Sequence, residues 1–162
     1  MERKADVAYC IAVMRHISVV RVRPEGRMPR LSKVVLAGEI VLAYLATRPR
    51  MGHEDLPELV SISRNTAGAP RARLEPGSPE ASMVAVRLGN AVNRTLEFLP
   101  TDARCLAQAL VLSRLLSARG ISSTLVIGAH SKPHFAAHAW IEHEGKPVLP
   151  QQEFRESRLL EL

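Results

Sequence analysis

A cysteine and a histidine, Cys105 and His138, stand in contexts that suit a nucleophile and its base. Cys105 is expected in the first turn of a helix over residues 104–119. There a thiol experiences the positive end of the helix dipole and unpaired backbone N–H groups, which favour the thiolate and lower its pKa. The backbone N–H of Cys105 can also hold a developing oxyanion, and Arg104 adds a positive charge nearby. A lone cysteine is more often a core residue, so this interpretation depends on what faces it.

The histidine lies in a stretch that alternates like a strand. In residues 135–142, the side chains of His138, Trp140 and Glu142 face one side, and the residues between them face the other. Alanines flank His138, which lets a neighbouring element approach closely. A cysteine-bearing helix packed on this strand would assemble a thiolate–imidazolium pair. Taken alone, this histidine would be better interpreted as structural.

Helices precede strands along the chain. Helical spacing of apolar residues predicts four helices, over residues 31–47, 56–64, 80–98 and 104–119. After Gly120, which suits a helix C-cap, extended periodicity predicts three strands, over residues 123–127, 135–142 and 146–149. Glu144-Gly145 is expected to form the hairpin turn between the last two strands. Helices followed by an antiparallel sheet give an α+β fold, and residues 65–79 are expected to form a loop.

The ends of two helices carry further local signals. The helix over residues 31–47 is expected to be capped by Ser32 and to end at Arg48-Pro49. The helix over residues 80–98 is preceded by Ser78-Pro79, with proline in the first turn. One apolar stripe of the first helix is expected to face the core, formed by Val34, Val35, Gly38, Val41, Leu42 and Leu45.

The net charge of +6 is confined to the first third of the chain. Residues 1–50 hold ten Lys and Arg against four Asp and Glu, and the remainder is balanced. A basic arm can bind nucleic acid, an anionic membrane surface or an acidic protein. An acidic protein, or no specific role, is favoured over nucleic acid because the aromatic interleaving of base-stacking surfaces is missing. We interpret residues 1–30 as a basic N-terminal extension or edge strand, and residues 31–162 as a single domain.

Cysteine usage and hydropathy indicate a cytoplasmic protein with reduced thiols. The two cysteines, Cys10 and Cys105, do not form the dense framework of a small secreted domain. The first residues are charged and show no secretory signal. The longest apolar run, residues 34–46, contains Glu39 and is shorter than the roughly 20 residues that span a bilayer, so no stable membrane insertion is expected.

Several short segments together resemble the lasso-peptide leader peptidases, transglutaminase-like cysteine proteases of bacterial lasso-peptide biosynthesis. They are Arg104-Cys105-Leu106, Leu115-Leu116, Gly120-Ile121, Leu125-Val126-Ile127-Gly128 and Phe135-Ala136-Ala137-His138-Ala139-Trp140-Ile141-Glu142, with Gly145 and Val148. The resemblance covers residues 80–150 well and residues 30–65 loosely. It implies a papain/transglutaminase-like fold, in which N-terminal helices precede a cysteine-bearing helix packed on a small antiparallel sheet. It also implies a cysteine endopeptidase with Cys105 as nucleophile and His138 as base.

The resemblance further implies partners. Such enzymes cut the leader from a ribosomally made precursor, and a separate cyclase then closes the released core. The leader is held by a recognition domain that is either fused to the protease or a separate protein. Only about 100 residues precede Cys105, which leaves little room for a fused module. We therefore expect a separate leader-binding protein, with the cyclase as a further partner.

At one position the chain departs from the family pattern. An acidic residue normally follows the histidine by twelve positions and completes a Cys-His-Asp triad, but here that position is Pro150. A third residue orients the imidazole and fixes its tautomer. The alternatives are Glu153, ranked first, then Gln151, Gln152 or Glu142, or a dyad without a third member.

Other functions remain open on the sequence alone. Acyl transfer to an amine uses the same thioester, and the departure at Pro150 leaves room for a non-catalytic scaffold of the same fold. His130, His134 and His138 are spaced by four, but Pro133 disfavours the helix that would make them a metal face, so no metal is expected. No glycine-rich phosphate loop is present, and no cofactor is expected.

Overall fold

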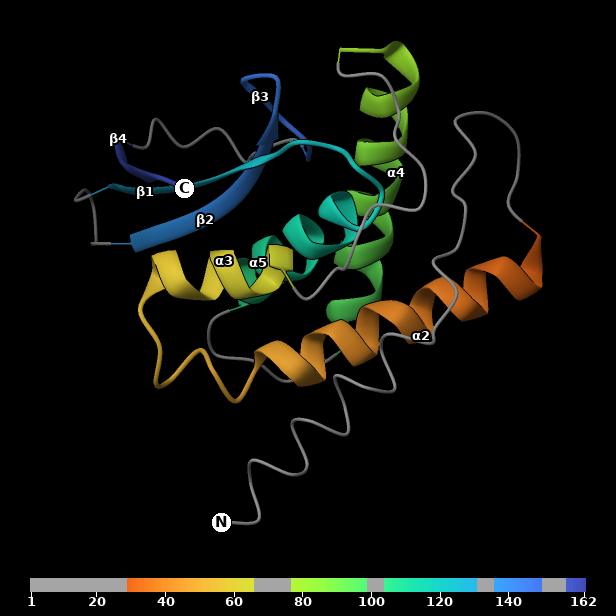
Figure 1. The fold of residues 1–162 in the computed structure, drawn as a ribbon, viewed down its shortest axis with the longest axis horizontal. Helices are drawn as coiled ribbons and strands as arrows, with labels where there is room; N and C mark the ends of the chain where they lie inside the picture. Colours follow the sequence, from red (N-terminus) through yellow and green to blue (C-terminus); the bar gives the residue numbers. More distant parts are fainter. Residues whose placement is uncertain (1–28, 66–76, 99–103, 131–135, 150–156) are drawn as a thin grey trace.

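The structure is a computed structural model that describes residues 29–65, 77–98, 104–130, 136–149 and 157–162. Four helices come first in the described part: α2 (Arg30–Thr47), α3 (Leu56–Asn65), α4 (Pro79–Leu96) and α5 (Arg104–Ser117). Four strands follow: β1 (Thr124–His130), β2 (Ala136–His143), β3 (Lys146–Pro147) and β4 (Ser157–Glu161). The helices lie on one side of the sheet (Figure 1), which confirms the predicted α+β layout.

The strands form one antiparallel sheet in the order β3-β2-β1-β4. The longest pairing joins β1 to β2, with Gly128 opposite His138 and Val126 opposite Trp140. The turn between β2 and β3 lies at Glu144 and Gly145, both with positive φ, 53° and 71°. This is the pattern of a tight type I′ hairpin turn, as the sequence predicts.

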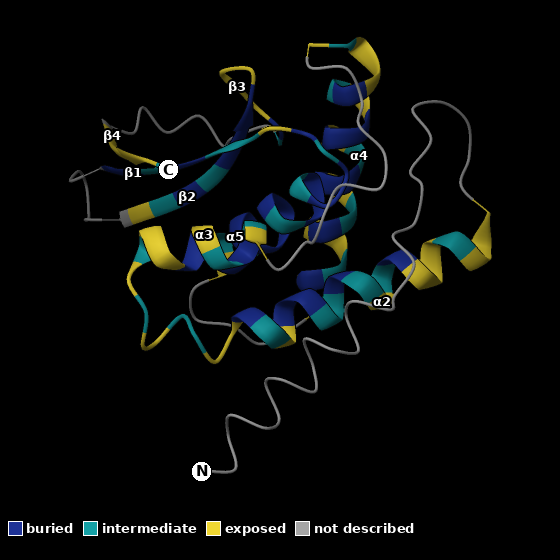
Figure 2. Cartoon of the chain, viewed as in Figure 1, coloured by how far each residue is buried: buried dark blue, intermediate teal, exposed yellow. Residues whose placement is uncertain are grey.

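Helix α5 forms the centre of the molecule. It contacts α2, α3, α4 and β2, and to a lesser extent β1, and buried residues concentrate along it (Figure 2). Leu110, Val111 and Leu116 are fully buried. Gly120, with a φ of 72°, ends the segment after α5, and the Ile121 N–H donates to the Leu116 carbonyl. A helix packed on all sides holds its first residues in a fixed position relative to the sheet.

The buried face of α2 differs from the predicted stripe. Val34, Gly38 and Leu45 are exposed, Val34 to 68%. The helix instead buries the opposite stripe, formed by Leu36, Ile40, Ala43, Tyr44 and Thr47. Apolar residues occur on nearly all sides of α2, so periodicity alone did not select the face that packs. The first turns of α2 are exposed in Figure 2.

The N-terminal signal predicted from the sequence is confirmed at α4, whereas the predicted cap of α2 is wrong. Ser78 caps α4, and its Oγ accepts from the Ala81 N–H at 3.2 Å. The predicted cap Ser32 lies inside α2, which starts after Pro29 without a side-chain cap. Proline restrains its own φ and suits the entry to a helix, which accounts for the earlier start.

The last strand, β4, was not predicted. It pairs with β1 on the side opposite β2. The terminal Leu162 continues this pairing, because it exchanges backbone hydrogen bonds with Leu125 and its carbonyl accepts from Arg64 of α3. The basic extension or edge strand expected over residues 1–30 lies almost wholly outside the described residues, as does most of the loop expected over residues 65–79. No described helix has the length and apolar character needed to cross a membrane.

Candidate active site

Cys105 is the second residue of α5 and is a half-buried free thiol. The first N–H groups of a helix have no partner within the helix, so they are available to a negative group placed there. The backbone N–H of Leu106 acts in this way on the sulfur and lowers the pKa of Cys105. The helix start therefore provides part of the environment that the sequence predicts for this thiol.

The structure brings Cys105 and His138 together. A hydrogen bond from the His138 side chain is the largest influence on the thiol and lowers its pKa. Burial raises the pKa of the thiol, but the backbone N–H of Ala139 and the charge of His138 lower it, and the net direction is down. A sulfur held between an imidazole and two backbone N–H groups is stabilised as the thiolate.

The sheet topology explains how neighbouring residues of β2 reach the same sulfur. His138 and Ala139 have side chains on opposite faces of the strand, and Ala139 and Ile141 belong to the core. Strand β3 pairs with β2 at Glu142 and His143, and the Val148 N–H donates to the Ile141 carbonyl, so the described pairing along this edge of β2 ends two residues from Ala139. The first turn of α5 approaches at that edge, where a backbone N–H and an adjacent side chain can both contact one atom.

A row of interacting side chains extends from His138 along the same face of β2. The rings of His138 and Trp140 are stacked, with centroids 6.1 Å apart and an interplanar angle of 18°. Trp140 Nε1 donates to Glu142 Oε1 at 2.9 Å. Arg158 of β4 donates to the same oxygen at 2.7 Å. The predicted shared face of His138, Trp140 and Glu142 is thus a connected row, and Arg158 is a member that sequence reasoning missed.

The proposed third catalytic residue is not placed by the structure. Glu153 lies outside the described residues, as do Pro150, Gln151 and Gln152. Glu142 is 4% exposed and bound to Trp140 and Arg158. It lies four residues along the strand from His138, a Cα separation of about 13 Å at 3.3 Å per residue. The described contacts of Glu142 are therefore with Trp140 and Arg158 rather than with the imidazole.

The remaining histidines of the sheet have other surroundings. His143 is buried, and its Nδ1 lies 2.8 Å from the Ser122 carbonyl, which places a proton on Nδ1 because a carbonyl only accepts. This contact joins the end of β2 to the segment before β1 and is structural. His134 lies outside the described residues. Among the residues that are described, no group of three or more His, Cys, Asp or Glu side chains could hold a metal ion.

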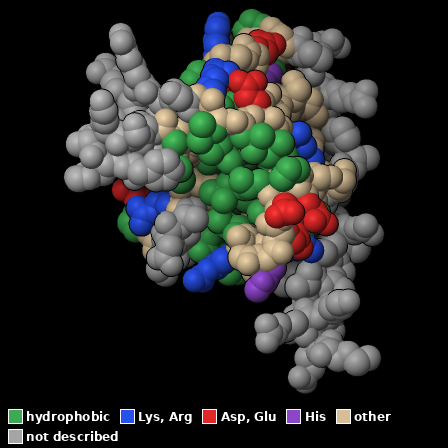
Figure 3. Space-filling view, turned by 90° about the vertical axis from the view of Figure 1, so that its left-hand side faces the viewer, with side chains coloured by type: hydrophobic (Ala, Val, Ile, Leu, Met, Phe, Trp, Pro, Cys, Tyr) green, Lys and Arg blue, Asp and Glu red, His purple; other side chains and the backbone are tan. Residues whose placement is uncertain are grey.

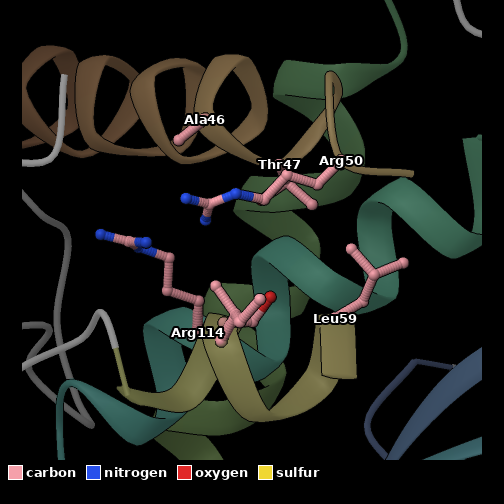
Figure 4. A pocket seen from close by; sticks show the side chains of 7 residues that line it. Ala46, Thr47, Arg50, Leu59 and Arg114 are labelled. Carbon is pink, nitrogen blue, oxygen red and sulfur yellow. The ribbon is translucent and has the colours of Figure 1, made fainter. Parts of the chain in front are cut away.

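A small pocket between α2, α3 and α5 lies away from the thiol (Figure 4). Arg50 and Arg114 reach into it from opposite walls, and Ser63 also lines it. Burial lowers the pKa of Arg114, Glu39 opposes this effect, and the charge of Arg50 adds to it. Arg114 follows Cys105 by nine residues on α5, about 13 Å along the helix axis. This pocket therefore does not extend the site at Cys105.

The side of the molecule on which β2 begins faces the viewer in Figure 3. Hydrophobic side chains gather in the middle of this face, and acidic and basic side chains lie around them (Figure 3). Strand β4 is on the same side in Figure 1, and its Leu159 and Leu160 are exposed, Leu159 to 65%.

Fold and site agree with the comparison to known families. The family model described as the Transglutaminase-like superfamily matches residues 43–158, which include both Cys105 and His138. The match spans well over half of the chain, and the chain belongs to the transglutaminase-like superfamily. Members of this superfamily are usually enzymes, either cysteine peptidases or acyltransferases. No curated protein and no solved structure matches the chain significantly.

Proposed function

We propose that this chain is a cysteine endopeptidase that removes the leader from a lasso-peptide precursor. The observation that carries the proposal is the hydrogen bond between Cys105, at the start of α5, and His138 of β2. The proposal is supported by the superfamily match and by the resemblance of the cysteine and histidine segments to leader peptidases.

In the first half of the reaction, the Cys105 thiolate attacks the carbonyl carbon of the scissile peptide bond. The resulting oxyanion accepts a hydrogen bond from the backbone N–H of Cys105 at the start of α5. His138, protonated in the ion pair, donates its proton to the departing amine as the C–N bond breaks. The core peptide leaves with a free N-terminus, and the leader remains attached to sulfur as a thioester.

In the second half, neutral His138 accepts a proton from water while the water oxygen attacks the thioester carbonyl. The C–S bond breaks, the leader leaves as a carboxylic acid, and the thiolate–imidazolium pair is restored. Glu153 is the proposed third residue, which would orient the imidazole.

The proposal includes partners. A separate leader-binding protein presents the precursor, and a lasso cyclase consumes the free amine that the cleavage creates. The proposed compartment is the cytoplasm, where a ribosomal precursor and a reduced Cys105 coexist.

The direct test combines the chain with a lasso-peptide precursor and the leader-binding protein of the same pathway. Mass spectrometry should detect a leader ending in a free carboxylate and a core with a free amine. Cys105→Ala and His138→Ala should each lower the cleavage rate at least a hundredfold, because both steps need the pair. Undiminished cleavage by Cys105→Ala would refute the assignment.

Acyl transfer is the second function that the superfamily match supports. Adding a primary amine to the reaction separates the two activities by product mass. Hydrolysis gives the leader acid at every amine concentration, whereas a transferase gives the leader amide in proportion to the amine. A scaffold without catalysis would give neither product.

A further inference from the structure

The side chains of His138, Trp140 and Glu142, which we name the β2 row, lie on one face of β2, and each interacts with the next. The ring centroids of His138 and Trp140 are 6.1 Å apart, within the 4.5–7 Å range of interacting aromatic pairs. Their planes differ by only 18°, so the imidazole lies offset over the indole rather than edge-on. A stacked indole restricts rotation of the imidazole about its side-chain bonds.

The indole itself is held by a buried charge. Its Nε1–H donates to Glu142 Oε1 at 2.9 Å, and the Glu142 side chain is 4% exposed. A carboxylate that is buried needs an opposite charge, and Arg158 supplies one at 2.7 Å from the neighbouring strand β4. The ion pair with Arg158 fixes the Glu142 carboxylate, and the hydrogen bond from Trp140 Nε1–H to that carboxylate fixes the indole ring.

The ion pair crosses the middle strand of the sheet. Strand β1 lies between β2, which carries Glu142, and β4, which carries Arg158. The Arg158–Glu142 pair therefore links the two strands that flank β1. The charged and titratable groups in contact with the row include Cys105 from α5 and Arg158 from β4, and Arg158 also binds Glu161.

We propose that Trp140 is a positioning residue that holds the His138 ring against the Cys105 sulfur, with Glu142 and Arg158 acting through it. The inference rests on the proposed function, because it assigns a role relative to the catalytic pair. Trp140 touches the imidazole, and its π face favours the imidazolium that pairs with the thiolate. Glu142 and Arg158 do not act on the imidazole directly.

The test is the rate of Cys105 alkylation by iodoacetamide as a function of pH, followed by peptide-mapped mass spectrometry. No substrate is needed. Trp140→Leu removes the ring and should lower the rate at pH 6 about tenfold, with the midpoint of the pH profile moved upward by about one unit. Trp140→Phe keeps a ring but cannot donate to Glu142, so a roughly threefold loss is expected.

Glu142 supplies the discriminating variants. Glu142→Ala should also cost about threefold, and the double variant Trp140→Phe/Glu142→Ala should cost no more than either single change, because both break one contact. Glu142→Gln retains an acceptor for Nε1–H and should restore nearly the original rate. Glu161→Gln is the matched control: it removes an exposed partner of Arg158, leaves Glu142 in place, and should have no effect.

The outcomes separate this inference from the proposed function. Wild-type Cys105 that reacts no faster than glutathione at pH 6 would contradict the proposed function itself. Fast wild-type reaction with unchanged Trp140→Leu and Trp140→Phe profiles would overturn the positioning role alone. Additive losses in the double variant would also overturn it, since they would mean that Glu142 acts by another route. Circular dichroism of each variant establishes that the comparison is between folded proteins.

Discussion

The thiol of Cys105 is activated by its contacts rather than by a neighbouring charge in sequence. The imidazole of His138 and the backbone N–H groups of Ala139 and Leu106 lower its pKa. Arg104 is exposed and is not among the groups that shift this pKa. The positive charge next to the cysteine in the sequence therefore has little part in its ionisation.

Replacement of Arg104 tests this distinction. Arg104→Gln should change the alkylation rate of Cys105 at pH 6 by less than about twofold, because the exposed guanidinium is screened by solvent and salt. The measurement is the iodoacetamide rate at low and physiological ionic strength. A loss of tenfold or more would assign the activation to Arg104 instead of His138.

The pH dependence of the thiol follows from the direction of its shift. A pKa below that of an ordinary thiol means that the thiolate persists at lower pH, and reactivity is lost only as the pH falls through the lowered pKa. The stability that the folded state gains from this group is fully present above the ordinary thiol pKa of the unfolded chain and is lost as the pH falls through the lowered pKa. A half-exposed group contributes modestly, so reactivity is the better observable.

At the scale of elements, α5 has the most demanding position, since it presents the cysteine at one end and forms the core with the rest. One polar side chain, that of Ser113, is buried in this helix. Ser113 is fully buried, and its Oγ has no hydrogen-bond partner in the structure as described. A buried hydroxyl without a partner loses its hydration without compensation.

Ser113→Ala should therefore stabilise the protein, by about 1 kcal/mol from the relieved hydroxyl and the better helix propensity of alanine. Urea unfolding followed by circular dichroism measures the change. Leu110→Ala in the same helix provides the opposite control and should cost about 3 kcal/mol through the cavity it leaves. Destabilisation by Ser113→Ala would indicate that the hydroxyl has a partner.

The elements also show what the sequence could predict. The helix that contains Cys105, the helix capped by Ser78 and the hairpin at Glu144-Gly145 each carry a local signal in caps, glycines or alternation. Strand β4 has no such signal, because Ser157–Glu161 is short and its partners lie some thirty residues earlier in β1. Arg158 consequently stayed outside the predicted site. The prediction of the buried face of α2 was wrong, because only tertiary packing selects between the apolar sides of this helix.

At the scale of the whole molecule, a buried ion pair ties the first described helix to the end of α5. Arg119 donates to both carboxylate oxygens of Glu39 in α2, at 3.2 and 2.9 Å, and also to the Leu115 carbonyl. The side chains are 7% and 13% exposed. The pair fixes the helical layer on which the site depends.

Glu39→Ala removes the carboxylate that neutralises Arg119 and should lower the free energy of unfolding by about 3 kcal/mol. The matched control is Glu54→Gln, which alters the more exposed and longer Arg50–Glu54 pair and should cost less than about 1 kcal/mol. Equal effects in thermal or urea unfolding would mean that the Glu39–Arg119 pair has no special part in stability.

The sequence could predict that the Cys105 sulfur of α5 meets the His138 imidazole of β2, but it could not predict every contact of that sulfur. Local patterns identified the helix that carries Cys105 and the strand that carries His138. The contribution of Ala139 through its backbone depends on where the pairing along this edge of β2 ends, which among the described residues is at Ile141. Such an edge is a property of sheet topology, which no local pattern encodes.

The most direct test of the account is the pH profile of Cys105 alkylation in the wild-type chain and in His138→Ala. We predict that wild-type Cys105 reacts with iodoacetamide at pH 6 at least tenfold faster than glutathione, and that His138→Ala removes most of this advantage and moves the profile toward that of an ordinary thiol. Identical profiles for the two proteins would contradict the account, because the imidazole would then have no part in the ionisation of the thiol.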